Sequence, residues 1–140
     1  MSDPVPLKES SADLSRQEQS YLDAAIALAR TSTCTQKHGA IITKGGSILS
    51  VGVNRRRNDP AVTVKGATFH AEEMAIRNLR GADANKAKIY VARVSKLDIP
   101  ALSRPCNRCY VLIKRMGIKE IYYTDWTTHE EDLNCNSSCS

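Results

Sequence analysis

Long apolar segments are absent from this 140-residue sequence. No apolar run approaches the roughly 18 residues that a membrane-spanning helix needs, so we expect no membrane partner. The opening residues, MSDPVPLKESSADLS, also lack the basic start and apolar stretch of a secretory signal. Membrane insertion and secretion are therefore not expected for this chain.

The sequence has five cysteines and no export signal, so we expect these cysteines to be in a reducing compartment. In a reducing compartment, thiols are more often metal ligands or core residues than disulfide partners, and we expect a cytoplasmic protein.

The length is too short for two ordinary domains. We expect a flexible tail at 1–14, rich in Ser, Pro and Asp, one domain at 15–126, and a second tail at 127–140.

Acidic residues are scarce in one part of the chain. Residues 34–69 carry six basic side chains and one acidic one, whereas residues 1–33 carry three basic and five acidic ones. Lys and Arg neutralise phosphate charge, so the basic stretch suits a phosphate-bearing ligand, from a nucleotide to a nucleic acid. A solvated basic loop that aids solubility explains the composition equally well.

The periodicity of apolar residues predicts alternating helices and strands. Ser15 and Glu18 fit a capping box, and a first helix is expected up to about Arg30. The further expected elements are a hairpin of 39–43 and 47–53, a helix at 70–80 before Gly81, a strand at 88–94, a helix at 106–116 before Gly117, and a strand at 118–124. This order predicts an α/β fold, a three-layer α/β/α sandwich with a mixed sheet whose later strands run parallel.

Two short motifs carry the chemistry, His70-Ala71-Glu72 and Pro105-Cys106-Asn107-Arg108-Cys109. Cys106 and Cys109 are three residues apart, so both sulfurs point the same way on a helical turn and can share one zinc ion. His70 would be the third protein ligand, which leaves the fourth position for a water whose pKa zinc lowers to about 7. Glu72 could reach this water without binding zinc and move its proton.

The pattern H-x-E followed by P-C-x-x-C is typical of zinc nucleobase deaminases. From Ser15 to Thr124 the chain resembles the cytidine and deoxycytidylate deaminase superfamily. The resemblance implies a cytidine deaminase-like fold, a Zn²⁺ cofactor and hydrolytic removal of an exocyclic amine. It further implies that Asn54, after the hairpin, contacts the sugar of the substrate, and that the backbone N–H of Ala71 meets the carbonyl of the base.

Several other residues are candidates for the substrate cleft. Arg55 and Arg57, in the arginine run after Asn54, are candidates to bind a 5′ phosphate, since arginine grips phosphate through paired donors. Trp126 is a candidate for a cleft wall. His38 is expected at the surface or in a turn, bordering the cleft. Cys135 and Cys139 suit free thiols in a frayed tail better than a second zinc site.

The sequence leaves three hypotheses about function. The first is conversion of a small cytosine nucleoside or nucleotide, of the cytidine, deoxycytidine or dCMP type, to its uracil form with release of ammonia. The second is a nucleic-acid deaminase that acts on tRNA adenosine or on cytosine in a single strand, where the base is flipped out or unpaired. The third is a noncatalytic zinc-binding interaction module. A small sheet with an exposed edge also predicts a homo-oligomer.

Overall fold

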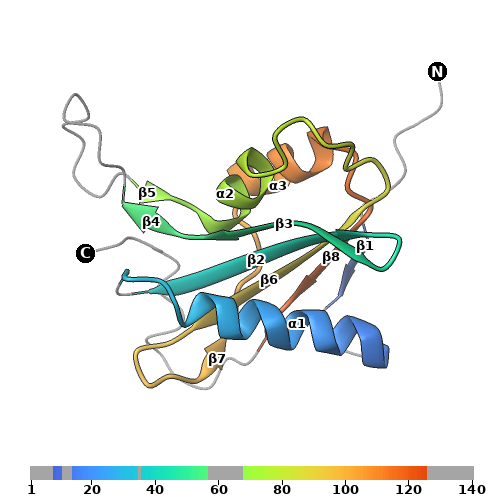
Figure 1. Cartoon of the computed structure of the whole chain (residues 1–140). Coiled ribbons are helices and arrows are strands. Elements are labelled where there is room, and N and C mark those ends of the chain that lie inside the picture. Colours follow the sequence, from blue (N-terminus) through green and yellow to red (C-terminus); the bar gives the residue numbers. More distant parts are fainter. Residues whose placement is uncertain (1–7, 11–13, 35, 57–67, 126–140) are drawn as a thin grey trace, which may run out of the picture.

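The helices of this protein lie on both faces of a mixed sheet (Figure 1). The computed structural model describes residues 8–10, 14–34, 36–56 and 68–125. Helix α1 (Arg16–Ala29) covers one face, and α2 (Ala71–Arg77) and α3 (Asn107–Arg115) cover the other. The predicted three-layer α/β/α architecture is confirmed. Within the described ranges, no helix has both the length and the hydropathy to cross a membrane.

The main sheet contains both parallel and antiparallel pairs. Its order is β1 (Lys8–Ser10), β8 (Glu120–Tyr123), β6 (Lys88–Val94), β2 (Lys37–Lys44) and β3 (Ser47–Val53), with β7 (Pro100–Ala101) also paired to β6. A separate pair consists of β4 (Arg55–Arg56) and β5 (Thr68–Phe69). Strands β6 and β8, joined through α3, run parallel as predicted, and β2 is antiparallel to both β3 and β6.

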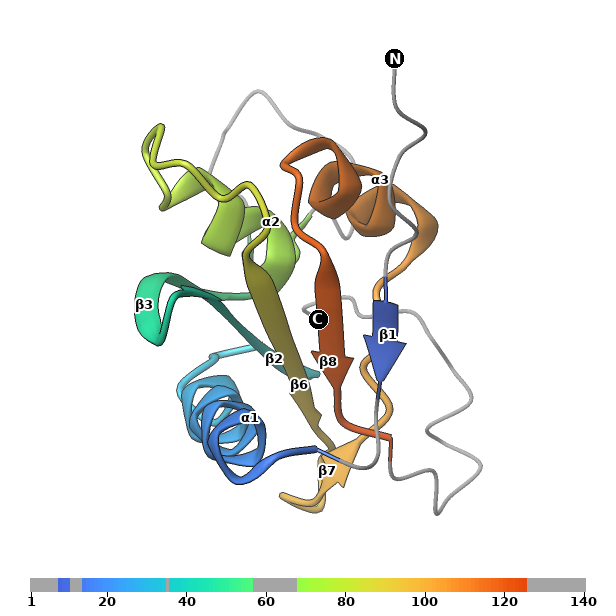
Figure 2. The same cartoon turned by 90° about the vertical axis from the view of Figure 1, so that its right-hand side faces the viewer.

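The amino-terminal segment differs from the expected flexible tail. Residues Lys8–Ser10 form β1, which runs parallel to β8 with Glu9 opposite Ile121 (Figure 2). The expectation of a tail is wrong for these three residues, because backbone groups at a sheet edge can pair with a polar segment that has no apolar pattern. Glu9 also accepts two hydrogen bonds from the Arg104 guanidinium.

Helix α2 is shorter than its apolar pattern predicts. It ends at Arg77, and tighter turns follow up to Gly81, where φ is +86°. The Asn78 side chain donates a hydrogen bond of 2.7 Å to the Val51 carbonyl of β3, which fixes the helix end on the sheet. Gly81 therefore ends the helical segment as predicted, but the last turn before it is not α-helical.

The two faces of the sheet have separate apolar cores. Along β6, Ile89 and Val91 pack beneath α2 and α3, whereas Tyr90, Ala92 and Val94 pack against α1. This alternation follows from the two-residue period of a strand that is buried on both faces.

Glycine allows a helix to approach each face closely. A Cβ added to Gly52 of β3 would lie 2.3 Å from the amide nitrogen of Ala75 and 2.5 Å from the carbonyl oxygen of Ala71, both in α2. On the other face, a Cβ at Gly39 would lie 2.6 Å from the carbonyl oxygen of Ala25 in α1. Both helices therefore pack backbone to backbone with the sheet, and the start of α2 is fixed in position.

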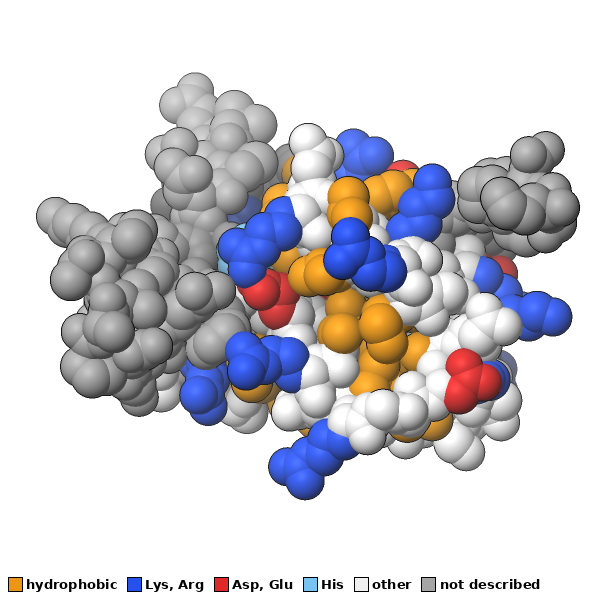
Figure 3. Space-filling view, turned by 90° about the horizontal axis from the view of Figure 1, so that it is seen from above, with side chains coloured by type: hydrophobic (Ala, Val, Ile, Leu, Met, Phe, Trp, Pro, Cys, Tyr) orange, Lys and Arg blue, Asp and Glu red, His pale blue; other side chains and the backbone are white. Residues whose placement is uncertain are grey.

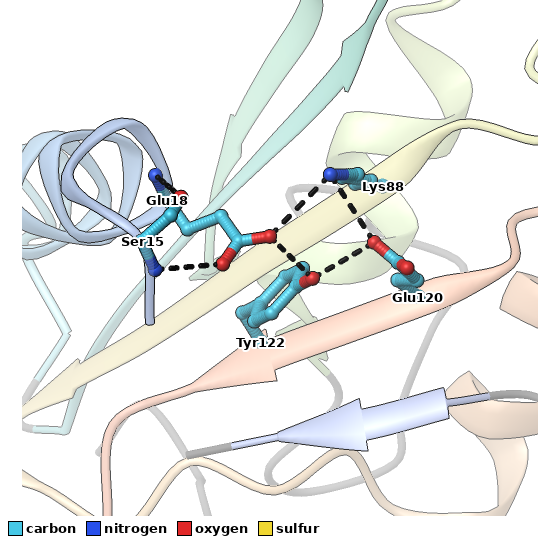
Figure 4. Close-up of polar contacts among 5 residues, drawn as sticks. All are labelled: Ser15, Glu18, Lys88, Glu120 and Tyr122. Atoms are coloured by element: carbon cyan, nitrogen blue, oxygen red, sulfur yellow. Dashed lines mark hydrogen bonds and ion pairs between the residues drawn. The ribbon is translucent and has the colours of Figure 1, made fainter. Parts of the chain in front are cut away.

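A polar cluster joins α1 to the sheet at the start of β6 and β8 (Figure 4). The Tyr122 hydroxyl lies 2.7 Å from a carboxylate oxygen of Glu18 and 2.8 Å from one of Glu120, and Lys88 donates to both carboxylates. Glu18 also closes the predicted capping box with Ser15. The pKa of Glu18 is lowered to about 2, and the largest cause is the hydrogen bond from the backbone N–H of Ser15. The hydrogen bond from Tyr122 is the next largest cause.

We predict that acid destabilises the protein through Glu18. Its pKa is lower in the folded chain, so this stabilisation is complete above the unfolded value of 4.5 and is lost as the pH falls towards 2. After discounting for solvent screening, we expect a loss of about 1–2 kcal/mol. Urea titrations between pH 6 and pH 2.5 measure it. Glu18→Gln should flatten this dependence, and an unchanged slope in that variant contradicts the assignment.

Candidate functional site

Three metal-ligating side chains converge where α2 and α3 begin. Nδ1 of His70 lies 3.3 Å from Sγ of Cys109 and 3.7 Å from Sγ of Cys106, and all three ligand atoms lie within 4.8 Å of one another. Bond lengths of 2.3 Å to sulfur and 2.0–2.1 Å to nitrogen give a nitrogen-to-sulfur separation of about 3.6 Å in a tetrahedral zinc site. The side chains therefore fit a zinc ion with one position left for another ligand.

The local electrostatics suit a cation at this point. Burial lowers the pKa of His70, which favours the neutral imidazole that binds metal ions. Burial, with the negative charge of Glu72, raises the pKa of the Cys109 thiol. A bound divalent cation would stabilise the thiolate form that burial alone disfavours, so this group of side chains is suited to binding a metal.

Glu72 is buried beside this cluster, with 5% of its surface exposed. Burial raises its pKa to about 7, and hydrogen bonds from the backbone and from Cys109 oppose that increase without cancelling it. A carboxyl group with a pKa near neutrality can both accept and return a proton. Glu72 thus has the environment of a general acid and base.

A cavity of about 320 Å³ opens onto the cluster. Its lining includes His70, Cys106 and Glu72 at the cluster. The other lining residues come from the ends of β2, β3 and β6 and from the loop before α3, and are Gln36, His38, Asn54, Arg93, Leu102, Ser103, Arg104 and Pro105. The face that carries α2 and α3 is rich in Lys and Arg side chains (Figure 3). The reactive residues therefore share one cavity, and its lining also contains Arg93 and Arg104.

Asn54 lies in this cavity wall and also organises the chain around it. Its Oδ1 accepts hydrogen bonds from the Ser32 hydroxyl, at 2.7 Å, and from the His38 backbone N–H, at 2.9 Å. Its Nδ2 donates to the Gln36 carbonyl at 2.7 Å. Asn54 therefore holds the segment before β2 in place, and its predicted contact with a sugar stays a prediction.

The structure describes two of the remaining substrate candidates, Ala71 and Arg55. Ala71 is fully buried at the start of α2, directly after His70. Arg55 is exposed and pairs with Phe69, just before His70, but is not among the lining residues. Arg57 and Trp126 fall outside the described residues. His38 borders the cavity as expected, but it lies in β2 with its Nε2 atom buried and not in a surface turn.

Sequence reasoning missed an ion pair that joins the two halves of the cluster. Glu73 accepts a hydrogen bond of 3.3 Å from the His70 backbone N–H and forms an ion pair with Arg108, which lies between the two cysteines. One carboxylate thus links the histidine to the helix that carries the sulfurs. The only signal in the sequence was an acidic residue beside one motif and a basic residue inside the other.

Comparison with known families gives a match over most of the chain. Residues 15–125 match the family model described as "Cytidine and deoxycytidylate deaminase zinc-binding region". This description and the cluster of His70, Cys106 and Cys109 together confirm the prediction of zinc as the cofactor. No curated protein matches the chain.

Solved structures of several deaminases share the fold. The apo dCMP deaminase from cyanophage S-TIM5 is 23% identical, with a TM-score of 0.63 over 86% of this chain and 91% of its own. Guanine deaminase from Bacillus subtilis is 21% identical, with a TM-score of 0.55 over 89% of this chain and 73% of its own. Cytidine deaminase from Mycobacterium leprae is 19% identical, with a TM-score of 0.52 over 71% and 82%. The predicted cytidine deaminase-like fold is therefore confirmed.

We predict that Glu73→Gln weakens zinc binding about tenfold, because groups that orient metal ligands typically contribute 10–100-fold to metal affinity. The substitution keeps the size of the side chain and removes the charge that pairs with Arg108. Competition with a chromophoric zinc chelator measures the affinity. Asp83→Asn is the matched control, since it removes an exposed carboxylate paired with Lys44. Equal zinc affinity in the two variants contradicts the role of Glu73.

Proposed function

This chain belongs to the cytidine and deoxycytidylate deaminase zinc-binding family, and we propose from that premise that it hydrolytically deaminates a cytosine nucleotide. One observation carries the proposal. The ligand atoms of His70, Cys106 and Cys109 converge within 4.8 Å at a cavity that also contains the buried carboxyl group of Glu72. Metal ligands, a proton-transfer group and space for a substrate are therefore present together.

His70, Cys106 and Cys109 would hold Zn²⁺, which when bound supplies a Lewis acid and lowers the pKa of the reacting water. Glu72 takes a proton from this water and delivers it to the departing amine, so the ring carbon gains oxygen and ammonia leaves. The Glu73–Arg108 ion pair keeps the two helix starts in register. Only 5% of the Glu72 surface is exposed, so bulk solvent has little access to its carboxyl group.

A phosphorylated substrate suits the charges around the cavity. Arg93 and Arg104 contribute to its lining, where Arg104 also pairs with Glu9, and Arg55 lies in β4 opposite Phe69, directly before His70. Arginine binds phosphate through paired donors. One cyanophage S-TIM5 dCMP deaminase structure, 20% identical over 89% of this chain, is a complex with dCMP and dUMP. These features favour a nucleotide over a nucleoside.

The alternative of a noncatalytic zinc module is disfavoured by Glu72. Burying a carboxyl group beside two thiols costs stability, and a structural zinc site gains nothing from it. A nucleic-acid substrate stays an alternative that the assay below distinguishes. Assembly into a homo-oligomer and a cytoplasmic location also stay predictions.

We predict that the zinc-loaded protein converts at least one cytosine nucleotide to its uracil form, and that Glu72→Gln abolishes turnover but retains zinc. The amide can occupy the same space but cannot transfer the proton, and losses of 10²–10⁴-fold are typical for a general acid or base. Loss of ultraviolet absorbance over a panel of nucleosides and mono-, di- and triphosphates measures turnover, and metal analysis measures zinc.

Each outcome of that assay has a distinct meaning. Turnover of a single-stranded oligonucleotide alone replaces the nucleotide proposal with the nucleic-acid alternative. Inactivity on every substrate at full zinc occupancy supports the noncatalytic module. Retained activity in Glu72→Gln removes this residue from the mechanism.

We predict that alanine at Arg55, Arg56 and Arg57 together raises KM for a phosphorylated substrate about tenfold or more and changes KM for the matching nucleoside far less. The reason is loss of charge-assisted hydrogen bonds to the phosphate. Steady-state kinetics with both substrates measures the difference, and Arg80→Ala, which removes an exposed arginine beyond α2, is the control. An equal rise for both substrates refutes a phosphate role.

A further inference from the structure

The apolar rows beneath α2 and α3 end in polar residues. On this face, β2 carries Ile42 and Ala40 and β6 carries Ile89 and Val91, all within one apolar core. Two residues further along each strand, the residues on the same face are His38 and Arg93, which are direct partners in the β2–β6 register. Both line the cavity at the metal cluster. The sheet thus changes from apolar to polar where the cavity begins.

The backbone of His38 is fixed from both sides. Its N–H donates to Oδ1 of Asn54 at 2.9 Å, and its carbonyl accepts a hydrogen bond of 3.3 Å from the Asn54 N–H. This pairing fixes the backbone at His38, and from this position the residue lines the cavity.

The imidazole of His38 contains a polar atom that is not satisfied within the fold. Its Nε2 atom is buried and has no hydrogen-bond partner among the residues that the structure describes. Leaving such a group unpaired destabilises the folded chain, and most buried polar groups in folded proteins are paired. A group that occupies the cavity can supply the missing partner.

The electrostatic surroundings keep His38 neutral. Burial is the main cause that lowers its pKa to about 3, and electrostatic interactions with Arg93 and His70 act in the same direction. A neutral imidazole offers one N–H and one acceptor nitrogen, which suits uncharged polar atoms better than it suits a phosphate. His38 lines the same cavity as the metal-ligating residues His70 and Cys106.

We propose that His38 hydrogen-bonds through Nε2 to the heterocycle of the bound substrate and thereby acts as a specificity-determining residue. The inference rests on the proposed function, because it takes the cavity to be the substrate site. It assigns His38 to the base, whereas the arginines are assigned to the phosphate. The buried atom has no partner among the described residues, and the entering base supplies one.

The test compares ligands with and without a base by calorimetric titration of the zinc-loaded protein. dUMP contains both the heterocycle and the sugar phosphate, and 2-deoxyribose 5-phosphate contains only the latter. We expect His38→Phe to weaken dUMP binding about tenfold, as expected for a lost hydrogen bond, and to leave binding of the sugar phosphate unchanged. His38→Gln, which keeps a donor and an acceptor, should restore part of the dUMP affinity.

Two controls separate substrate contact from a structural role. Lys37→Met changes the neighbouring residue, whose side chain lies on the opposite face of β2, and should leave both affinities unchanged. His38→Phe should retain zinc and have a melting temperature equal to or above that of the wild type, because an unpaired polar atom is removed. A structural role predicts the opposite, with lower stability and equal losses for both ligands.

The proposal is overturned if His38→Phe binds dUMP as tightly as the wild type, or loses affinity for both ligands equally. Failure of the proposed function is distinguishable, since the wild type then does not bind dUMP. In that event the same comparison is made with single-stranded oligonucleotides that carry either a cytosine or an abasic site at one position. A wild type that binds none of these ligands contradicts both proposals.

Discussion

The convergence of ligands from two helices is the constraint on which the rest of the structure depends. His70 precedes α2 and the cysteines lie at the start of α3, so both helices must begin at the same end of the sheet and on the same face. Close packing of α2 on Gly52 and the Glu73–Arg108 ion pair fix this arrangement. A shift of about 1 Å in either helix would move the ligand atoms out of the range that one zinc ion spans.

The features that could be predicted from the sequence are those with a local pattern. Helix and strand periods identified the main elements, and the spacing within H-x-E and P-C-x-x-C identified the three converging side chains and the buried carboxyl group of Glu72 beside them. The ion pair of Glu73 and the burial of the His38 ring nitrogen could not be predicted, because they depend on pairing between distant segments. An ion pair between α2 and α3, or a polar residue at the end of an apolar row, leaves no period to recognise.

The cavity combines groups that each reduce the stability of the folded chain. A carboxyl group is buried at Glu72, a ring nitrogen is buried at His38, and a guanidinium is nearly buried at Arg93. Each would be replaced by an apolar residue if packing alone mattered. Their concentration around one 320 Å³ cavity, beside a core that consists mainly of Ile, Val and Ala, is typical of a functional site.

The short strand β1 has a consequence for handling the protein. Its three residues occupy the outer edge of β8, whose backbone would otherwise present free donors and acceptors. A chain shortened to begin at Ser15 would retain every metal ligand yet expose this edge beside the apolar residues Ile121 and Tyr122. Such an edge is a template for intermolecular strand pairing, so aggregation rather than loss of chemistry would limit the shortened protein.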